Sequence, residues 1–396
     1  MITVIGGTYR EIDYDEIVID IFGSGFRGSK FLLENNCIVD FHTTGNQETL
    51  LFLKENQKVY KNLSYNCKEY NDIITFKYSF SLDNPTIYPN LLNISKTEEL
   101  NVKAENIIAY GMLETDFKLS GKKIVYDPQT SIKPNKFRDI GQAEELVYIV
   151  NMKEAQSLAS SDDIEDIKSF FFKIEKATAF IIKNGPYGAT LYYNHNEIKV
   201  PSYITENVNK IGSGDIFTAS FGYYWIEKGL SFEESALNAS KSTAYYCDKK
   251  VFVDICQLLE FEYVEFDNKD LKNKQVYLAS PFFALSELIL IDKIRSAFLE
   301  FGVSIFSPFH DIGFGDDATI AKKDIEGIEN SDIIFCVFDN LDSGTLVESG
   351  YSLAKGKKLI GYHRTCEESK LLMLKPGDLK VFTNLTTAIY QTIWNL

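Results

Sequence analysis

The sequence has no long hydrophobic run, no paired cysteine motif and no excess of positive charge. No stretch approaches the ~20 apolar residues of a membrane helix, and the first residues lack the basic start and apolar core of a secretion signal. The six cysteines are scattered without a CxxC pair, which argues against a zinc site and a disulfide framework. We therefore expect a cytoplasmic protein with reduced thiols, no membrane partner and no tight metal site made of protein side chains alone.

Basic residues are in the minority. The chain has 41 Lys and Arg against 56 Asp and Glu, for a formal net charge of −15. Nucleic-acid binding requires clustered Lys and Arg that displace counterions from the phosphate backbone. The composition thus disfavours DNA or RNA as a partner and favours small-molecule substrates.

The 396 residues exceed what one hydrophobic core usually organises, so we expect two domains. Short β-rich runs at 2–7, 123–128, 145–151 and 178–185 are separated, at least between the last three, by helix-patterned stretches. That alternation is typical of an α/β protein with a parallel sheet. A charged, aperiodic segment at 261–274 is the expected linker. From 275 onward a second, shorter βα series predicts a five-stranded, doubly wound parallel sheet.

The segment IGSGDIF contains the first candidate site. Gly212, Ser213 and Gly214 directly precede Asp215 and a predicted helix. The unpaired N–H groups of such a helix start can hold a phosphate, and Asp215 can take a proton from a substrate hydroxyl that accepts a phosphoryl group. Taken alone the pattern is weak, because an Asp after a glycine turn also caps many ordinary helices.

Two further motifs in the right order strengthen this reading, and together they make residues 1 to about 260 resemble the ribokinase-like (PfkB) family of sugar and nucleoside kinases. The resemblance implies an α/β/α sandwich that uses ATP and Mg²⁺. Asn151 and Glu154 match an N-x-x-E motif that in the family acts around magnesium and phosphate. The elements matching the family's ATP-phosphate region are Lys183, Gly185 and Gly188 together with Gly212, Ser213 and Gly214.

The resemblance weakens toward the N-terminus. Where the family shows an early sugar-binding glycine element with an Asn, this chain has GSGFRGSKFL with Arg27 and no matching Asn. Gly6 and Gly7 are candidates for lining the acceptor site, although tight turns explain them equally well. Asn209 stands where many relatives carry an Asp that supports a monovalent cation, so we expect little dependence on potassium.

The second candidate site contains three acidic residues after position 275. Glu348 lies near the start of a predicted helix, six residues after Asp342, and Asp324 lies in the preceding helix. The helix start should favour the ionised form of Glu348, which is the form that attacks an anomeric carbon. A second carboxyl group can then handle the proton of the leaving group. Each acid taken singly is equally well explained as a helix cap.

Taken together, YLASPF at 277–282, the Asp324 element and D-x-G-T-x-x-E at 342–348 make residues 275–375 resemble the nucleoside 2-deoxyribosyltransferase family. By that resemblance Glu348 is the nucleophile, Tyr277 orients it, and Asp324 acts at the base, without any cofactor. Asp342 and Gly344 are expected at the sugar, where the charge of Asp342 would repel a 5′-phosphate and favour a nucleoside over a nucleotide.

Recognition of the base is less well defined. Four aromatic residues are candidates for stacking on it, with burial in the core as the alternative: Phe282, Phe283, Phe309 and Phe314. The family often supplies an Asn to the site of a neighbouring subunit, but Leu371 stands at the aligned position. We nevertheless expect a homo-oligomer.

The sequence thus predicts a bifunctional enzyme that cleaves or transfers an N-glycosidic bond and phosphorylates a sugar or nucleoside hydroxyl. One alternative is that the kinase-like part only senses a ligand and regulates an N-glycoside hydrolase. Another is that hydrolysis of a nucleotide pool serves defence.

Overall fold

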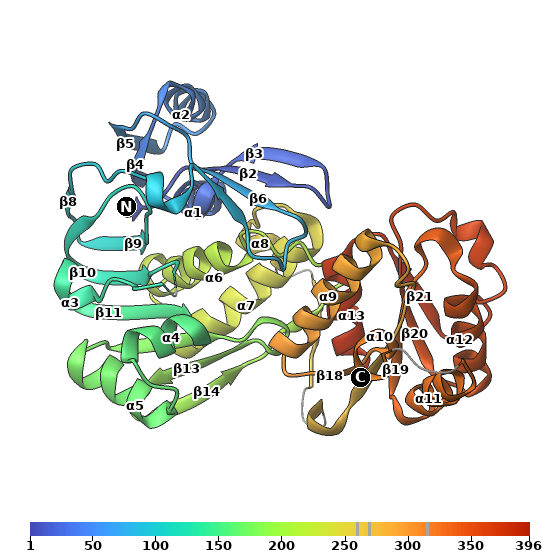
Figure 1. Ribbon diagram of the computed structural model, residues 1–396. Helices are drawn as coiled ribbons and strands as arrows, with labels where there is room; N and C mark the ends of the chain where they lie inside the picture. The colour runs from blue at the N-terminus through green and yellow to red at the C-terminus, as the bar shows by residue number, and fades with distance from the viewer. Residues whose placement is uncertain (131, 259–260, 268–270, 314–316) are drawn as a thin grey trace. The chain divides into compact units, whose positions relative to one another are not determined.

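The computed structural model describes residues 1–130, 132–258, 261–267, 271–313 and 317–396. The chain divides into two compact units (Figure 1). Unit 1 comprises residues 1–79 and 84–266, and unit 2 comprises residues 80–83 and 267–396.

A ten-stranded sheet forms the centre of unit 1. Nine strands follow the order β14-β13-β12-β11-β10-β9-β1-β4-β5, and β8 pairs with β10. All pairs are parallel except β12 with β13 and β13 with β14. The strands are β1 (Ile2–Ile5), β4 (Val39–Gly45), β5 (Leu63–Glu69), β8 (Leu100–Lys103), β9 (Asn106–Tyr110), β10 (Phe117–Asp127), β11 (Gly141–Asn151), β12 (Ala179–Lys183), β13 (Ala189–Tyr193) and β14 (Asn196–Val200).

Helices cover both faces of this sheet, which is why its central strands are continuous hydrophobic runs such as LVYIV at 146–150. One hydrophobic cluster joins a sheet face to α1, α2, α6 and α7, and another joins the opposite face to α4 and α5. The predicted α/β/α sandwich is therefore confirmed. The helices are α1 (Gly23–Glu34), α2 (Gln47–Val59), α3 (Phe137–Ile140), α4 (Met152–Ala159), α5 (Ile164–Ser169), α6 (Ser213–Gly222), α7 (Phe232–Lys249) and α8 (Ile255–Leu258).

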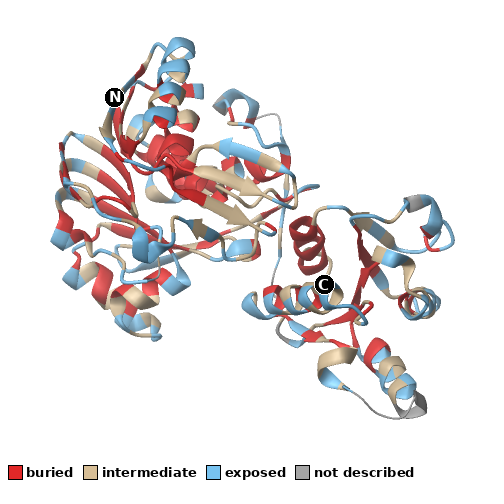
Figure 2. Cartoon of the chain, turned by 45° about the horizontal axis from the view of Figure 1, so that its top comes forward, coloured by how far each residue is buried: buried red, intermediate tan, exposed pale blue. Residues whose placement is uncertain are grey.

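Unit 1 also contains a separate four-stranded sheet, here called the small sheet, which the sequence did not reveal. Its strand order is β3-β2-β6-β7. Most of its residues are intermediate or exposed, as the tan and blue strands of Figure 2 show. The strands are β2 (Arg10–Asp13), β3 (Val18–Ile21), β6 (Thr75–Tyr78) and β7 (Thr86–Tyr88), and a further short pair is β15 (Tyr203–Ile204) with β16 (Val264–Glu265).

Unit 2 has a five-stranded sheet in the order β18-β17-β19-β20-β21, and every pair is parallel. This confirms the doubly wound sheet that the sequence predicts, with the chain reversing direction across the sheet at β17. The strands are β17 (Gln275–Ala279), β18 (Ser304–Phe306), β19 (Ile333–Val337), β20 (Lys358–Tyr362) and β21 (Leu379–Phe382). The helices are α9 (Leu285–Glu300), α10 (Pro308–Asp311), α11 (Asp317–Asn330), α12 (Ser343–Ala354) and α13 (Leu385–Trp394).

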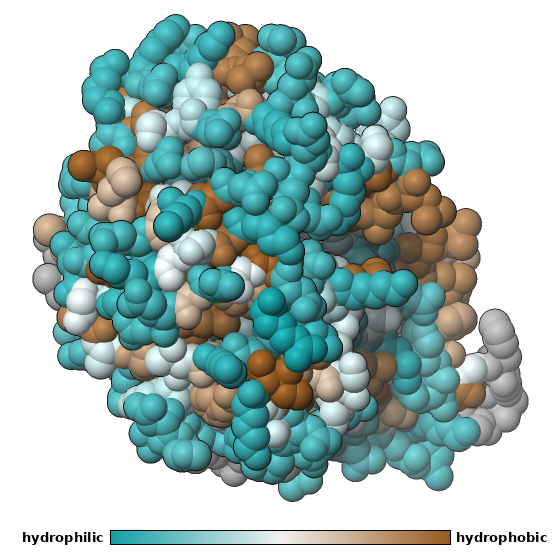
Figure 3. Space-filling view, turned by 90° about the vertical axis from the view of Figure 1, so that its left-hand side faces the viewer, coloured by the Kyte–Doolittle hydropathy of each residue, from teal (hydrophilic) through white to brown (hydrophobic). Residues whose placement is uncertain are grey.

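The surface is largely polar. Hydrophilic side chains cover most of the face shown in Figure 3. Across the described ranges, no helix has both the length and the apolar character needed to span a membrane.

Candidate active sites

The carboxyl end of the sheet in unit 2 brings together two residues that lie far apart in the sequence. The hydroxyl of Tyr277 on β17 donates a hydrogen bond of 2.8 Å to Oε1 of Glu348 on α12. Tyr277 is fully buried, so its ring fixes the position of the hydroxyl. The pKa of Tyr277 is raised by burial and by the charge of Glu348, so the phenol stays protonated and remains a donor. Glu348 is therefore held by a rigid partner.

The expectation that the helix start keeps Glu348 ionised is wrong. Burial raises the pKa of Glu348 to about 8, the hydrogen bond from Tyr277 lowers it, and the negative charges of Asp324 and Asp342 raise it further. Glu348 is the sixth residue of α12, beyond the first turn where the helix dipole acts. Desolvation outweighs the helix in deciding the charge of this group.

Asp324 on α11 belongs to the same group of carboxyl side chains. Its charge acts on both Tyr277 and Glu348. Burial raises the pKa of Asp324, and its Oδ1 is buried without a hydrogen-bond partner among the described residues. An unpaired buried carboxyl oxygen is costly unless a ligand satisfies it. One oxygen of Asp324 therefore remains unsatisfied in the group of carboxyl side chains that contains Glu348.

Asp342 is the N-cap of α12. Its Oδ2 accepts hydrogen bonds from the backbone N–H of Thr345 at 2.8 Å and from the Thr345 hydroxyl at 3.2 Å. Gly344 follows within the first turn, where a Cβ would lie 3.0 Å from the same Oδ2. The structure therefore gives Asp342 a capping role, and contact of Asp342 or Gly344 with a sugar stays a prediction.

Three of the four aromatic candidates for base stacking form a cluster. The rings of Phe282 and Phe283 stack with centroids 4.9 Å apart, and Phe309 lies 5.8 Å from Phe282. Phe283 is 77% exposed, so this cluster opens to solvent and offers an aromatic face. Phe314 lies outside the described residues. Leu371 is buried in the core of unit 2 and offers no polar group.

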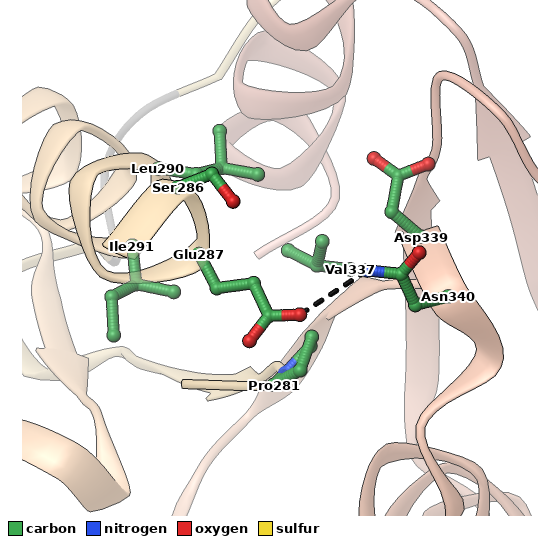
Figure 4. A pocket seen from close by; sticks show the side chains of 8 residues that line it. All are labelled: Pro281, Ser286, Glu287, Leu290, Ile291, Val337, Asp339 and Asn340. Atoms are coloured by element: carbon green, nitrogen blue, oxygen red, sulfur yellow. Dashed lines mark hydrogen bonds between the residues drawn. The ribbon is translucent and has the colours of Figure 1, made fainter. Parts of the chain in front are cut away.

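A pocket of about 140 Å³ lies beside α9 at the ends of β17 and β19 (Figure 4). Within it, the amide of Asn340 donates to Glu287 at 3.2 Å. The lining residues are Pro281, Ser286, Glu287, Leu290, Ile291, Val337, Asp339 and Asn340. Neither Glu348 nor Asp324 lines this pocket, and we assign it no part in the chemistry.

In unit 1 the glycine turn stands directly before α6. Gly212 is the N-cap with φ 77°, a left-handed conformation that favours glycine, and a Cβ there would lie 2.1 Å from Nε of Arg27. The first turn of α6 therefore presents N–H groups without intrahelical acceptors. Such a helix start is suited to bind an anion.

Asp215, in the first turn of α6, is held at both carboxylate oxygens. Nη1 of Arg27 donates to its Oδ2 at 2.8 Å, and the amide of Gln129 donates to its Oδ1 at 3.2 Å. Arg27 also binds both oxygens of Glu11 on β2 of the small sheet. Burial raises the pKa of Asp215, and Arg27 opposes this rise. The proposed base is thus part of a buried ion-pair network.

A second polar cluster lies on the other side of the turn. Nζ of Lys183, at the end of β12, donates to Oδ2 of Asp127 at 2.9 Å and would lie 3.3 Å from a Cβ at Gly214. Burial and the charge of Asp127 raise the pKa of Glu154 to about 7, while Lys183 lowers it. Two carboxyl groups and one ammonium group therefore gather beside the start of α6.

The N-x-x-E motif has a structural role here. The Asn151 side chain accepts from the N–H of Glu154 at 2.9 Å, and Glu154 Oε2 accepts from the N–H of Asn151 at 2.8 Å, which makes a capping box at the start of α4. Gly185 and Gly188 adopt positive φ in the turn between β12 and β13. Contacts of these residues with magnesium or ATP stay predictions.

Close backbone packing explains Gly6, and a neighbouring ring crowds Gly7. A Cβ at Gly6 would lie 2.7 Å from Cα of Gly25 on α1, and one at Gly7 would overlap the ring of Tyr9. Nothing in this packing requires an acceptor, so their role in the acceptor site also stays a prediction.

Sequence reasoning missed four residues of this site: Glu11, Asp127, Gln129 and Lys210. Lys210 lies two residues before Gly212, and its Nζ donates to the Ser213 hydroxyl at 2.7 Å. Asp127 ends a strand that the sequence predicted, and a carboxylate at a strand end is a recognisable signal. Glu11 had no such signal, because the small sheet was not predicted. Among the described residues, no group of three or more His, Cys, Asp or Glu side chains is arranged to hold a metal ion.

Comparison with protein families gives two matches. Residues 118–250 match the pfkB family of carbohydrate kinases, and residues 276–379 match nucleoside 2-deoxyribosyltransferase. The chain joins a pfkB-like domain to a nucleoside 2-deoxyribosyltransferase-like domain. Both resemblances found in the sequence are thereby confirmed, although the pfkB match does not reach the segment that contains Arg27.

Among solved structures, similar chains are ribokinase-family proteins. A putative ribokinase from E. coli is 12% identical and has a TM-score of 0.49, with 65% of this chain and 98% of that chain covered. A fructokinase from Vibrio cholerae O395 is 11% identical (TM-score 0.47, 66% and 99% covered), and a nucleoside kinase from Methanocaldococcus jannaschii is 13% identical (0.47, 66% and 97%). No curated protein sequence matches the chain.

Proposed function

We propose that the nucleoside 2-deoxyribosyltransferase-like domain cleaves the N-glycosidic bond of a deoxynucleoside through a covalent intermediate on Glu348. The observation that carries this proposal is the hydrogen bond of 2.8 Å from Tyr277 to Glu348, with the charge of Asp324 acting on both. A positioned carboxylate beside a second carboxyl group is the arrangement that glycosidic cleavage needs.

The chemistry follows from these side chains. The ionised carboxylate of Glu348 attacks the anomeric carbon, the carbon–nitrogen bond breaks, and the base leaves with the bonding electron pair. Asp324, whose pKa is raised by burial, delivers the proton to the leaving base. A second base or water then attacks the same carbon and releases Glu348. Transfer and hydrolysis differ only in this last acceptor.

The substrate is proposed to be a nucleoside, not a nucleotide. The carboxylate of Asp342, fixed as a helix cap, lies close enough to Glu348 for its charge to act there. A 5′-phosphate placed beside it would meet repulsion between like charges. The cluster of Phe282 and Phe283 offers an aromatic surface for the base.

The test is incubation with deoxynucleosides and a free acceptor base, followed by chromatography of the bases and nucleosides. Glu348→Ala should abolish exchange and release, whereas Glu326→Gln, on the exposed face of α11, should leave both unchanged. Absence of any exchanged or released base with the unaltered protein would sink the assignment.

For the pfkB-like domain we propose ATP-dependent phosphorylation of a sugar or nucleoside hydroxyl. The start of α6 would hold the transferring phosphate, with Lys183 beside it. Asp215 would accept the hydroxyl proton. A hydroxyl that reaches Asp215 shares its oxygens with Arg27 and Gln129, which each donate one hydrogen bond to them, or displaces one of these side chains.

The residues present fit a magnesium ion carried by the nucleotide. Burial, together with repulsion from Asp127, raises the pKa of Glu154 to about 7, and the repulsion is the kind of electrostatic cost that a nearby cation relieves. Carboxylate oxygens are the ligands that Mg²⁺ prefers. When bound, the ion would neutralise charge on the phosphates.

A second candidate function is favoured by the ion pair at Asp215. Arg27 binds this carboxylate and can keep it from accepting a hydroxyl proton. The pfkB-like domain would then bind a nucleotide without transferring phosphate and would regulate the nucleoside 2-deoxyribosyltransferase-like domain. Asp215→Asn, with Asp162→Asn on an exposed loop as its control, separates the two. Loss of ATP consumption in the first variant alone identifies a kinase. If glycosidic turnover is unchanged in Asp215→Asn and no sugar or nucleoside acceptor causes ATP to be consumed, the domain is a sensor.

A further inference from the structure

Three cationic side chains converge on the glycine turn of unit 1, and they are not equally neutralised. Arg27 lies against Gly212 and pairs with Asp215 and Glu11. Lys183 lies beside Gly214 and pairs with Asp127. The third is Lys210.

Lys210 directly precedes the turn and has no such pair. Its Nζ donates a hydrogen bond of 2.7 Å to the hydroxyl of Ser213, the first residue of α6. Within the described ranges it forms no ion pair with a carboxylate. The nearby thiol of Cys247 does not replace one, because burial raises the pKa of Cys247 to about 11 and keeps it neutral.

The position of this ammonium group is electrostatically unfavourable in the free protein. Burial lowers the pKa of Lys210 and the positive charge of Lys183 lowers it further, while the charge of Asp215 opposes this only in part. The start of α6 carries a partial positive charge of its own. A lysine placed against a helix start and a second lysine, without an ion pair to a carboxylate among the described residues, is stabilised in its charged form by a bound anion.

A second observation points to a ligand at the same turn. Arg27 is 3% exposed, and its Nε is buried without a hydrogen-bond partner among the described residues. This Nε is the atom closest to the position of a Cβ on Gly212, at 2.1 Å. An unsatisfied donor and an unpaired ammonium group therefore lie at the two ends of one turn.

We propose that Lys210 is a phosphate-binding residue of this chain, whose ammonium group contacts the terminal phosphate of a polyphosphate held at the start of α6. Ser213 holds the side chain in place for this contact. The proposal rests on the nucleotide site proposed above and adds to it a specific contact that the sequence motif does not contain. It holds equally for a kinase and for a sensor, since both bind the phosphate.

The experiment measures binding, not turnover. Calorimetric titration with ATP and Mg²⁺, and separately with inorganic pyrophosphate, is applied to the full chain and to Lys210→Met, which keeps the length of the side chain without its charge. Loss of a charged hydrogen bond to phosphate should weaken binding of both probes roughly 10- to 100-fold. Lys210→Arg should keep most of the affinity. Lys58→Met, at an exposed lysine of α2, is the matched control.

The outcomes are distinct. Weakened binding in Lys210→Met alone, with an unchanged thermal unfolding midpoint, supports the contact. Equal affinity in Lys210→Met and the unaltered protein overturns it and leaves the nucleotide site standing. If the unaltered protein binds neither ATP nor pyrophosphate, both the contact and the proposed nucleotide site fail. If Lys210→Met unfolds, the titration is repeated with Lys210→Gln, which keeps a hydrogen-bond donor for Ser213 but has no charge. Weakened binding of both probes then supports the contact, and unchanged affinity overturns it.

Discussion

Replacement of Tyr277 by Phe should change the pH dependence of glycosidic cleavage, not only its rate. The variant keeps the buried ring and removes the hydroxyl that donates to Glu348. With a pKa of about 8, Glu348 is ionised in roughly a tenth of the molecules at pH 7. A hydrogen bond to a charged group contributes about 1.5–3 kcal/mol, so its loss should raise the pKa of Glu348 by roughly one to two units.

The assay is kcat/KM for 7-methyl-2′-deoxyadenosine between pH 6 and 9. Its positively charged base has no N1 proton to lose in this range and leaves as a neutral molecule, so no proton donor is needed and the ionisation of Glu348 shapes the curve. In the unaltered protein the rate should rise about tenfold per pH unit and level off near pH 8. In Tyr277→Phe the rise should continue to higher pH, with a deficit of roughly 10- to 100-fold at pH 7 that shrinks toward pH 9.

The matched control is Tyr351→Phe. The hydroxyl of Tyr351 lies on α12, as Glu348 does, but it donates to the exposed Glu329 at 2.7 Å. The profile of this variant should coincide with that of the unaltered protein. A Tyr277→Phe curve that runs parallel to the unaltered one, lower by the same factor at every pH, would refute the claim that Tyr277 acts by stabilising the ionised form of Glu348.

Three further predictions concern stability and ions. The pKa of Glu348 is about 8 in the folded protein against an ordinary 4.5, so its burial lowers the free energy of unfolding progressively as the pH rises from 4.5 to 8. Glu348→Gln should therefore increase the free energy of unfolding in urea by a few kcal/mol at pH 8 and leave it unchanged at pH 4. Gly212→Ala should cost more than the roughly 1–2 kcal/mol of Gly229→Ala, because both have positive φ but only the first meets a side chain, that of Arg27; equal costs in urea unfolding would contradict this. Asn209 donates its amide to a backbone carbonyl at 2.7 Å, so ATP turnover should be the same in potassium and in tetramethylammonium salts, and a several-fold activation by potassium would count against it.

The sequence was sufficient for the two parallel sheets and for the convergence of Glu348 and Asp324, and the resemblance to the nucleoside 2-deoxyribosyltransferase family implied the contact of Tyr277 with Glu348. Strands that end at the same edge of a parallel sheet bring their following residues together, so an order of motifs along the chain becomes a neighbourhood in space. The charge of Glu348 could not be obtained in this way. The position of a residue in a helix can be predicted from the local sequence. Desolvation depends on how the folded protein packs around Glu348, and it is the largest contribution to the pKa of this residue.

The kinase-like site also contains some residues that lie in sequence motifs and others that only the folded chain brings together. The glycine turn and Lys183 lie in motifs and were found. Arg27 meets Asp215 across 188 positions, and Glu11 lies in a sheet whose short, half-exposed strands give little periodic signal. A departure from the family pattern at Arg27 was visible, but its partner was not.

The ion pairs of Arg27 also link two events that would otherwise be independent. One guanidinium group holds Glu11 on the small sheet and Asp215 at the start of α6. An acceptor that displaces Arg27 from Asp215 therefore weakens the attachment of that sheet. Such an acceptor must supply the free energy of opening this ion pair, so its apparent affinity is its intrinsic affinity multiplied by the fraction of molecules in which the pair is open. An acceptor with a group that binds Arg27 in place of Asp215 avoids that loss of affinity, so it should bind more tightly than an acceptor without such a group.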